Sequence, residues 1–115
     1  MQTWTSQAPI YQQLADRLAD RLLDGEPDEG EAMPSVRTLA SDYVLNPLTV
    51  SRALQTLVDE GVLETRRGVG MYVQPGARLR LRLAEREKFL KEEWPAIVEK
   101  LRRLGIKAHE LNWEI

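Results

Sequence analysis

The sequence predicts a mainly α-helical fold with one small β-hairpin, which places it in the α+β class. Three observations lead to this prediction. Apolar residues recur at helical spacing between Pro9 and Gly25. Two later segments open with helix-starting residues, Ser35 in the first and Asn46 followed by Pro47 in the second. After them, two short β-prone runs enclose a glycine-containing turn at residues 66–70.

The first predicted helix runs from Pro9 to Gly25. Pro9 suits its first turn, because the N–H that proline lacks would have no intrahelical partner there. One apolar stripe recurs every four residues, and Ala15 and Leu23 lie beside it; the stripe consists of Ile10, Leu14, Leu18 and Leu22. We expect this stripe to be buried. A polar, acidic loop from Glu26 to Met33 follows the helix.

The second and third predicted helices lie close together in the chain. Ser35 is the expected N-cap of a short helix that ends near Tyr43. Asn46 caps the next helix, which starts at Pro47 and ends near Glu60. The expected inner faces are Val36, Leu39, Ala40 and Tyr43 on one helix, and Val50, Leu54, Leu57 and Val58 on the other. A link as short as 44–46 forces a sharp crossing, as in a helix-turn-helix.

A β-hairpin is predicted after the third helix. Its strands are Val62–Thr65 and Met71–Gln74, and a turn with two arginines and two glycines joins them. Such a tip can approach another backbone closely. Pro75 and Gly76 end the domain. Residues 1–76 are therefore predicted to form a winged helix-turn-helix domain.

The chain from residue 77 to Leu104 is predicted to be helical again. Spacings of four, three, four and three residues make a narrow heptad seam of Leu90, Trp94, Ile97, Leu101 and Leu104. Pro95 must kink this helix or start a new one after Trp94. Residues 77–115 are predicted to be a helical dimerisation region, and the alternative is that the seam folds back on the domain core.

Charge is distributed unevenly along the chain, whose formal net charge is −2. Residues 1–33 carry two arginines against seven acids, a balance of −5. Residues 34–80 carry six arginines against four acids, a balance of +2, and residues 81–115 carry eight bases against seven acids, a balance of +1. Since the local field decides whether a face attracts nucleic acid, the total charge does not exclude a DNA partner.

The predicted DNA-binding surface combines three regions. The second helix offers the positive end of its dipole, with Ser35 and Arg37 to hold a phosphate. The first turns of the third helix offer side chains suited to a major groove, Asn46, Leu48, Thr49, Ser51 and Arg52. The hairpin tip offers Arg66, Arg67 and Gly68 to the adjacent minor groove. Plainer alternatives exist for each region. Ser35 is then only a cap, Arg37 and the hairpin tip are only solvated, and Leu48 is a surface residue or packs against the turn.

Several function classes lack support in the sequence. His109 is the single histidine and cysteine is absent, so no catalytic triad, metal site or disulfide is predicted, and the chain is not expected to be an enzyme. The acids Asp28, Glu29 and Glu31 lie in a turn-rich loop with no nearby base, which favours a solvated loop. No apolar run is long enough to cross a membrane and no signal peptide is recognisable, so a cytoplasmic protein without a cofactor is expected.

Four segments together resemble the GntR family of bacterial transcription regulators. They are PIYQQLADRL, MPSVRTLA, NPLTVSRAL and LVDEGVLETRRGVGMYV, and they cover about two-thirds of the chain. The Asn46-Pro47 helix start and the short helical tail are similar to the YtrA-like branch, which dimerises through short C-terminal helices. The resemblance implies that Arg37 contacts phosphate, that Asn46, Thr49, Ser51 and Arg52 belong to a recognition helix, and that Arg67 and Gly68 belong to a wing.

Two departures from the family pattern bear on these roles. Leu48 stands where members commonly carry a polar residue, which affects base specificity, and Met71 stands where they carry threonine, which affects wing packing. The resemblance further implies repression of an operon that encodes the regulator and an ABC transporter.

The expected function is therefore a homodimeric repressor that binds a palindromic operator, with half-sites roughly 34 Å apart or a multiple of that. The sequence leaves open whether a small-molecule effector binds at the subunit interface. The alternative function is a winged-helix module that binds another protein through Leu48 and the wing.

Overall fold

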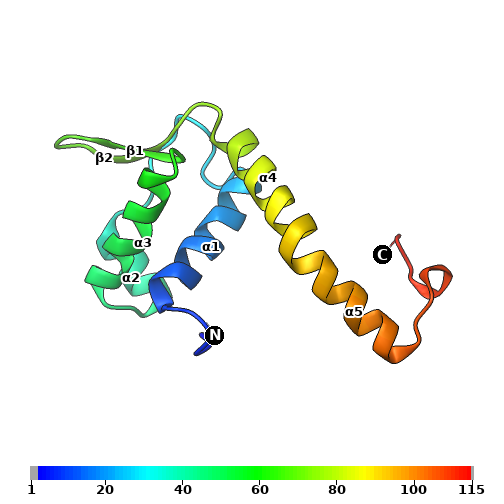
Figure 1. Cartoon of the computed structure of the whole chain (residues 1–115). Coiled ribbons are helices and arrows are strands. Elements are labelled where there is room, and N and C mark those ends of the chain that lie inside the picture. Colours follow the sequence, from blue (N-terminus) through cyan, green and yellow to red (C-terminus); the bar gives the residue numbers. More distant parts are fainter. Residues whose placement is uncertain (1–2, 115) are drawn as a thin grey trace. The chain divides into compact units, whose positions relative to one another are not determined.

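The computed structural model describes residues 3–114, and the chain forms two compact units. The first unit ends at Arg82, and the second begins at Leu83. The chain passes from one to the other within a single helix, α4 (Ala77–Lys88). Figure 1 labels the helices and strands along the chain.

The three helices predicted for the first unit are confirmed. They are α1 (Ile10–Leu23), α2 (Val36–Tyr43) and α3 (Pro47–Asp59). Both predicted caps form: the Ser35 side chain accepts a hydrogen bond from the Thr38 N–H, and the Asn46 side chain accepts one from the Leu48 N–H. Pro9 stands just before α1, at its N-cap. The local start signals therefore determine where α2 and α3 begin.

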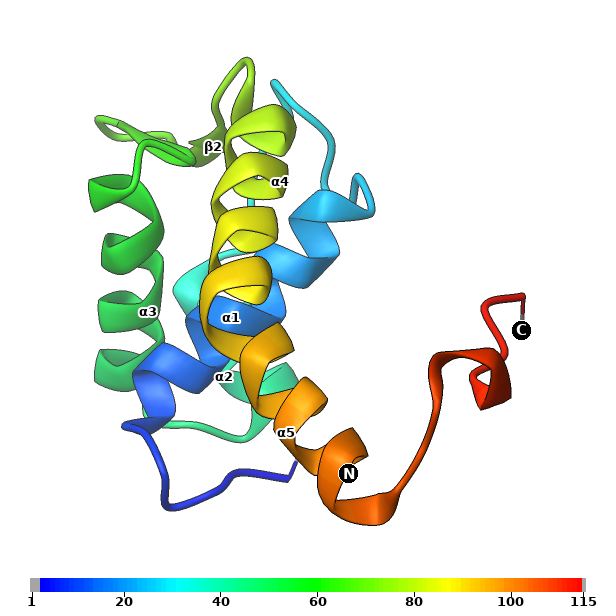
Figure 2. The same cartoon turned by 45° about the vertical axis from the view of Figure 1, so that its right-hand side comes forward.

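The core of the first unit lies between these helices and the hairpin, and α1 packs along α3 (Figures 1 and 2). Three residues of the predicted α1 stripe are almost completely buried, whereas Ile10 is 40% exposed. The core side chains come from every element of this unit and include Leu14, Leu18, Leu22, Leu39, Tyr43, Val50, Leu54, Leu57, Leu63 and Val73. Ile10 is the exception because the helix begins there, beyond the end of the core.

The hairpin consists of antiparallel strands β1 (Leu63–Arg66) and β2 (Gly70–Val73). Each strand lies one residue nearer the tip than predicted. Val62, predicted to start the first strand, belongs instead to the turn after α3, since its N–H donates to the Leu57 carbonyl. At the tip, Arg66 pairs with Gly70, which adopts a φ of 128°.

The acidic loop after α1 also pairs with the hairpin, which the sequence did not indicate. Ala32 forms an antiparallel bridge with Tyr72. The N–H groups of Gly30 and Met33 donate to the carbonyls of Val73 and Met71. The loop therefore covers the outer edge of β2 and closes a sheet edge that would otherwise be open.

The interpretation of the loop acids as merely solvated is wrong. Glu31 accepts a hydrogen bond from the Asp28 N–H at 2.7 Å, and the other two acids reach the start of α4. The Glu29 carboxylate accepts hydrogen bonds from the N–H groups of Gly76 and Arg78, at 2.6 and 3.4 Å, at the start of α4. Asp28 forms a salt bridge with Arg78. These acids neutralise and cap the beginning of α4, where orphan N–H groups attract negative charge.

The first unit extends beyond the boundary predicted at residue 76. Ala77 and Leu81, on α4, are 0% and 4% exposed and belong to its core. The start of α4 is thus part of the winged domain. The Pro75-Gly76 turn marks the end of the hairpin and not the end of the compact unit.

The second unit is helical, as predicted, with one change of helix type. Residues Phe89–Glu93 form a π-helical turn between α4 and α5 (Trp94–Leu104), and a 3-10 turn follows at Ala108–Glu110. The Trp94 N–H donates to the Phe89 carbonyl, five residues back. Pro95 has no N–H to donate and lies in the first turn of α5. The change of helix expected at this proline therefore takes the form of a π-helical turn followed by the start of α5. Gly105 ends α5 in the left-handed conformation, with a φ of 67°.

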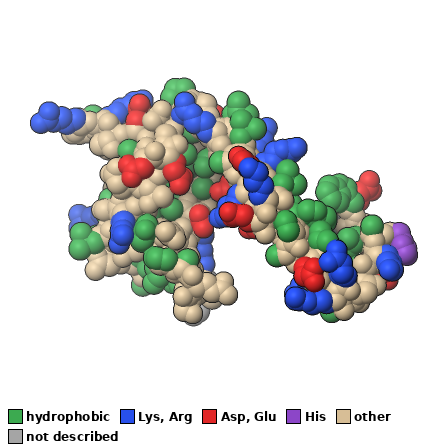
Figure 3. Space-filling model, viewed as in Figure 1, with side chains coloured by type: hydrophobic (Ala, Val, Ile, Leu, Met, Phe, Trp, Pro, Cys, Tyr) green, Lys and Arg blue, Asp and Glu red, His purple; other side chains and the backbone are tan. Residues whose placement is uncertain are grey.

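Among the described residues from Leu83 onward, none is buried. Hydrophobic side chains gather visibly on the surface of this part of the chain (Figure 3). No helix among the described residues is both long and apolar enough to span a bilayer.

Candidate nucleic-acid interface

The turn between α2 and α3 fixes how the two helices present their first residues. Val44 adopts a φ of 54°, ends α2 in the left-handed conformation, and is 85% exposed. Left-handed backbone is strained for a β-branched residue. Leu45 follows, and the Asn46 cap then begins α3, so only residues 44–46 separate the two helices.

The leading turn of α3 carries most of its predicted contacts on the outside. Leu48 is 78% exposed, and Ser51 and Arg52 are exposed as well. Thr49 is half-buried, because it faces the side of α1. Asn46 uses its carbonyl oxygen for the cap at 2.8 Å, which leaves its NH₂ group to donate elsewhere.

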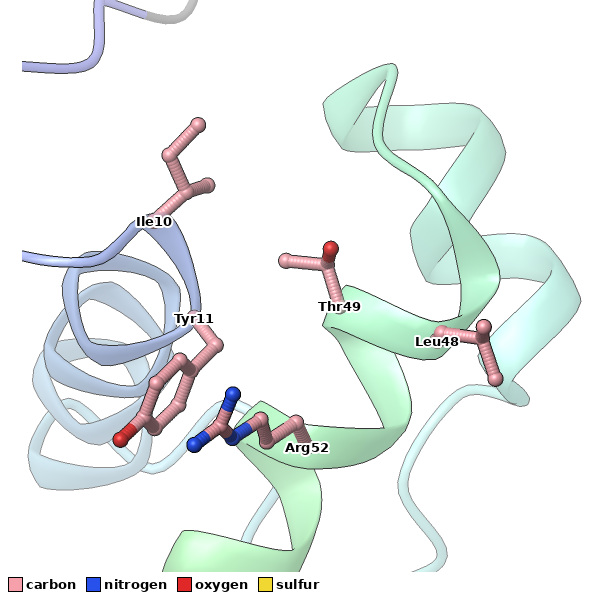
Figure 4. A pocket seen from close by; sticks show the side chains of 5 residues that line it. All are labelled: Ile10, Tyr11, Leu48, Thr49 and Arg52. Carbon is pink, nitrogen blue, oxygen red and sulfur yellow. The ribbon is translucent and has the colours of Figure 1, made fainter.

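Arg52 has a neighbour that the sequence analysis missed. Its guanidinium carbon lies 4.1 Å from the centre of the Tyr11 ring, a cation–π contact between α3 and α1 (Figure 4). A shallow hollow of about 320 Å³ lies at this place, and its lining residues are Ile10, Tyr11, Leu48, Thr49 and Arg52. Tyr11 follows the first apolar position of α1, and only the packing of α1 along α3 brings it here.

The start of α2 presents one free cation. Arg37 is exposed and forms no ion pair among the residues that the structure describes. The Ser35 hydroxyl is already engaged with Thr38, both as the helix cap and through the Thr38 hydroxyl at 3.0 Å. The capping role of Ser35 is therefore established, and the orphan N–H groups and Arg37 are the groups left to hold an anion.

The two wing arginines differ in their surroundings. Arg66 forms a salt bridge with Glu64 at 2.9 Å, and its guanidinium carbon lies 3.8 Å from the centre of the Tyr72 ring. Arg67 has no such partner within residues 3–114 and projects at the tip of the hairpin, where basic side chains are visible in Figure 3. Gly68 has a φ of 75°, and a Cβ there would meet nothing within 4 Å. The tip is therefore open around Gly68, with one free cation and one neutralised cation.

Two of the three predicted regions meet at a cleft of about 430 Å³ between the hairpin and the start of α2. Ser35 lines one side, and Arg66, Gly68 and Val69 line the other. The α3 edge belongs to the same compact unit. The predicted phosphate, groove and wing residues all therefore come from one folded unit with an independent core.

The predicted dimer seam lies in the second unit. Its residues are exposed in the single chain: Leu90 51%, Trp94 42%, Ile97 41% and Leu104 62%, with Leu101 half-buried. The rings of Phe89 and Trp94 lie 6.3 Å apart, which adds an aromatic side chain that the heptad spacing did not include. Exposed apolar side chains in such a row are typical of an interaction face.

Among the described residues, no group of three or more histidine, cysteine, aspartate or glutamate side chains is arranged to hold a metal ion. The arrangement of the first unit is that of a surface with exposed arginines and hydrogen-bonding groups on a rigid frame. Such a surface suits recognition of a phosphate backbone and base edges.

Comparison with known proteins agrees with this geometry. The family model for bacterial regulatory proteins of the gntR family matches residues 10–73. The HTH-type transcriptional repressor YtrA of Bacillus subtilis is 36% identical over 110 residues, which cover 96% of this chain and 78% of that protein.

Solved structures add the fold. A GntR family transcriptional regulator from Listeria monocytogenes has a TM-score of 0.75 at 26% identity, with 93% of this chain and 92% of that chain covered. YtrA from Sulfolobus acidocaldarius, a GntR-family transcription factor, has a TM-score of 0.59 at 32% identity, with coverages of 90% and 94%. These relatives are transcriptional regulators and not enzymes. The chain belongs to the GntR family of bacterial regulatory proteins and is a DNA-binding transcriptional regulator.

Proposed function

We propose that this regulator acts in the cytoplasm as a homodimeric repressor that binds a palindromic operator. The observation that carries the proposal is the exposed leading turn of α3, with Leu48, Ser51 and Arg52 facing solvent beside the free Arg37 of α2. In this geometry α3 enters the major groove, Arg37 and the start of α2 hold the phosphate backbone, and the wing follows the groove. Repression then results from occupation of promoter DNA.

The residues take distinct roles in this proposal. Arg52 makes a bidentate contact with guanine. The side chains of Asn46, Thr49 and Ser51 hydrogen-bond base edges or phosphates, and Leu48 offers an apolar contact such as one to a thymine methyl group. Arg67 and Gly68 make the wing contact. Arg66 takes part only when it leaves Glu64, since the salt bridge at 2.9 Å otherwise neutralises it.

Dimerisation through the seam supplies the two-fold symmetry that a palindrome requires. The support is the row of exposed apolar side chains on α5 and the turn before it, which no described residue of the single chain covers. A symmetric pair reads two half-sites and doubles the contacts with DNA.

The regulated target is proposed from the relationship with the repressor YtrA. We expect the operon that encodes this regulator to be the target, with an ABC transporter among its products. The proposed site for a small-molecule effector is the subunit interface.

The test is a gel-shift titration of the protein against its own promoter and against random duplex DNA. Arg52→Ala is expected to lower the affinity for the promoter by about 1–3 kcal/mol and to leave random DNA nearly unchanged. Arg86→Ala removes the same charge from an exposed position in the second unit and serves as the control.

Arg37→Ala separates the phosphate role from the base role. This variant is expected to weaken promoter and random DNA about equally and to reduce the slope of log K against log salt by about 1. Wild-type affinity that barely changes with salt would contradict DNA recognition by this surface and would favour the protein-binding alternative.

A further inference from the structure

We infer that Tyr11 is a positioning residue for base recognition, because its ring holds the Arg52 guanidinium at the groove-facing edge of α3. The inference rests on the proposed function of Arg52. The observation that supports the inference is the 4.1 Å contact between the Arg52 guanidinium carbon and the Tyr11 ring centre. Figure 4 shows the Tyr11 ring projecting from α1 toward the guanidinium of Arg52 on α3.

A stacked arginine keeps its capacity to recognise a base. The contact with Tyr11 uses the face of the guanidinium, whereas the N–H donors lie in its plane. Arg52 forms no ion pair among residues 3–114, so those donors stay available to guanine O6 and N7. Arg66, by contrast, has both its ring contact and a carboxylate on its N–H groups.

Tyr11 is itself well fixed. Its side chain is half-buried and packs against the core that Leu14 and Leu54 share. The Tyr11 hydroxyl accepts a hydrogen bond from the Gln12 side-chain amide at 3.3 Å. A fixed ring restricts a side chain that otherwise has many rotamers, and ordering it before DNA arrives lowers the entropic cost of binding.

The hollow beside the stack gives the base edge room. It has a volume of about 320 Å³, and Ile10 and Leu48 form apolar parts of its wall. Because α1 supplies two of its five lining residues, α1 and α3 together shape the place where Arg52 meets the DNA.

The experiment starts with duplexes that the wild-type full chain selects from a random library. The base pair at which Arg52→Ala loses its preference identifies the Arg52 contact. At that base pair, Tyr11→Leu is expected to reduce the preference about two- to five-fold, which is the fold-change that a cation–π contact at an exposed site corresponds to. Tyr11→Phe keeps the ring and is expected to retain the preference.

Two controls isolate the stack. Tyr11→Leu should have no further effect on the preference when Arg52 is already alanine, because the two residues act as a unit. Tyr72→Leu removes a comparable stack, of 3.8 Å on Arg66, and should leave the preference at the Arg52 base pair unchanged.

The outcomes distinguish the proposed role of Arg52 from that of Tyr11. If Arg52→Ala leaves every base preference intact, the proposed role of Arg52 fails and the inference fails with it. If Arg52→Ala loses a preference that Tyr11→Leu retains, only the inference is overturned. Equal weakening of all duplexes by Tyr11→Leu would show a merely structural role, and tighter binding would show that Tyr11 withholds Arg52; either result overturns the inference.

Discussion

Leu14, Leu39 and Leu54 are at most 1% exposed in the unit that ends at Arg82, whereas Leu90 and Trp94, in the unit that begins at Leu83, are 51% and 42% exposed. Both units consist largely of amphipathic helices. The difference lies in what each apolar face meets. In the first unit, three helices and a hairpin cover one another. In the second unit, the apolar seam has no cover among the described residues of the single chain, and for this reason we propose that a partner covers it.

The two units differ in the source of their stability. The first unit contains its own core, so its stability follows from contacts within the chain. The apolar surface of the second unit can contribute only when another surface covers it. Stability of the second unit is therefore expected to depend on protein concentration, as for any folded segment that association stabilises.

The largest expected effect is in the core of the first unit. Leu54→Ala should lower the free energy of unfolding by about 2–5 kcal/mol, because it removes a side chain that is 1% exposed and leaves a cavity. Denaturant titration measures this change. Leu48→Ala, in the same helix but at a residue 78% exposed, is the matched control and should change stability by less than about 0.5 kcal/mol. Equal effects would contradict the assignment of the core.

The next prediction concerns the seam. Trp94→Arg should convert the proposed dimer to monomers in sedimentation experiments, because it places a charge in the apolar face. Truncation of a central aromatic residue in an interface commonly costs about 2 kcal/mol or more. Trp113→Arg is the matched control, since Trp113 is 97% exposed and lies outside the seam. If the Trp94→Arg variant still dimerises with the wild-type affinity, the seam does not form the interface.

A smaller effect is expected where the first unit ends. Glu29→Gln should lower the free energy of unfolding of the first unit by about 1 kcal/mol, because the carboxylate caps the N–H groups of Gly76 and Arg78. Thermal or denaturant unfolding measures the change. Glu26→Gln, an exposed acid of the same loop, controls for the loss of one charge. An unchanged stability would show that the Glu29 carboxylate does not stabilise the start of α4.

The smallest effect is a gain. Val44→Gly should raise the free energy of unfolding by about 0.5–1 kcal/mol, because a β-branched residue at a φ of 54° is strained and glycine is not, although the flexible unfolded glycine offsets part of the gain. The measurement is the denaturant midpoint. Val69→Gly, at an exposed loop position without a positive φ, should give no gain. A loss of stability at Val44 would show that the turn is not strained.

The sequence predicted the elements well where a local signal exists. Ser35 and Asn46 cap their helices as expected, and Gly105 ends α5. Each of these signals depends on the backbone within one helical turn. The strand limits were displaced by one residue, because the use of Val62 in the turn after α3 depends on a hydrogen bond to Leu57 that no local preference indicates.

The contacts of the candidate site were only partly predictable. Glu64 and Arg66 lie two residues apart on one strand, so they share a face, and their salt bridge was within reach of the sequence once β1 was known to include Arg66. The stack of Arg52 on Tyr11 had no such signal. It joins two helices that are distant in the chain, and their packing alone sets it.

By itself, the sequence determined the kind of elements, their order, their caps and the residue types on the proposed DNA-binding surface, because these depend on spacing and on interactions over a few residues. Only the tertiary structure decided which charges are free. Arg67 and Arg37 are unpaired within the described residues, whereas Glu29 caps α4 across the domain and Arg52 stacks on Tyr11. Partners of this kind come together when the core brings separate segments side by side, and the pattern of a single segment carries no record of them.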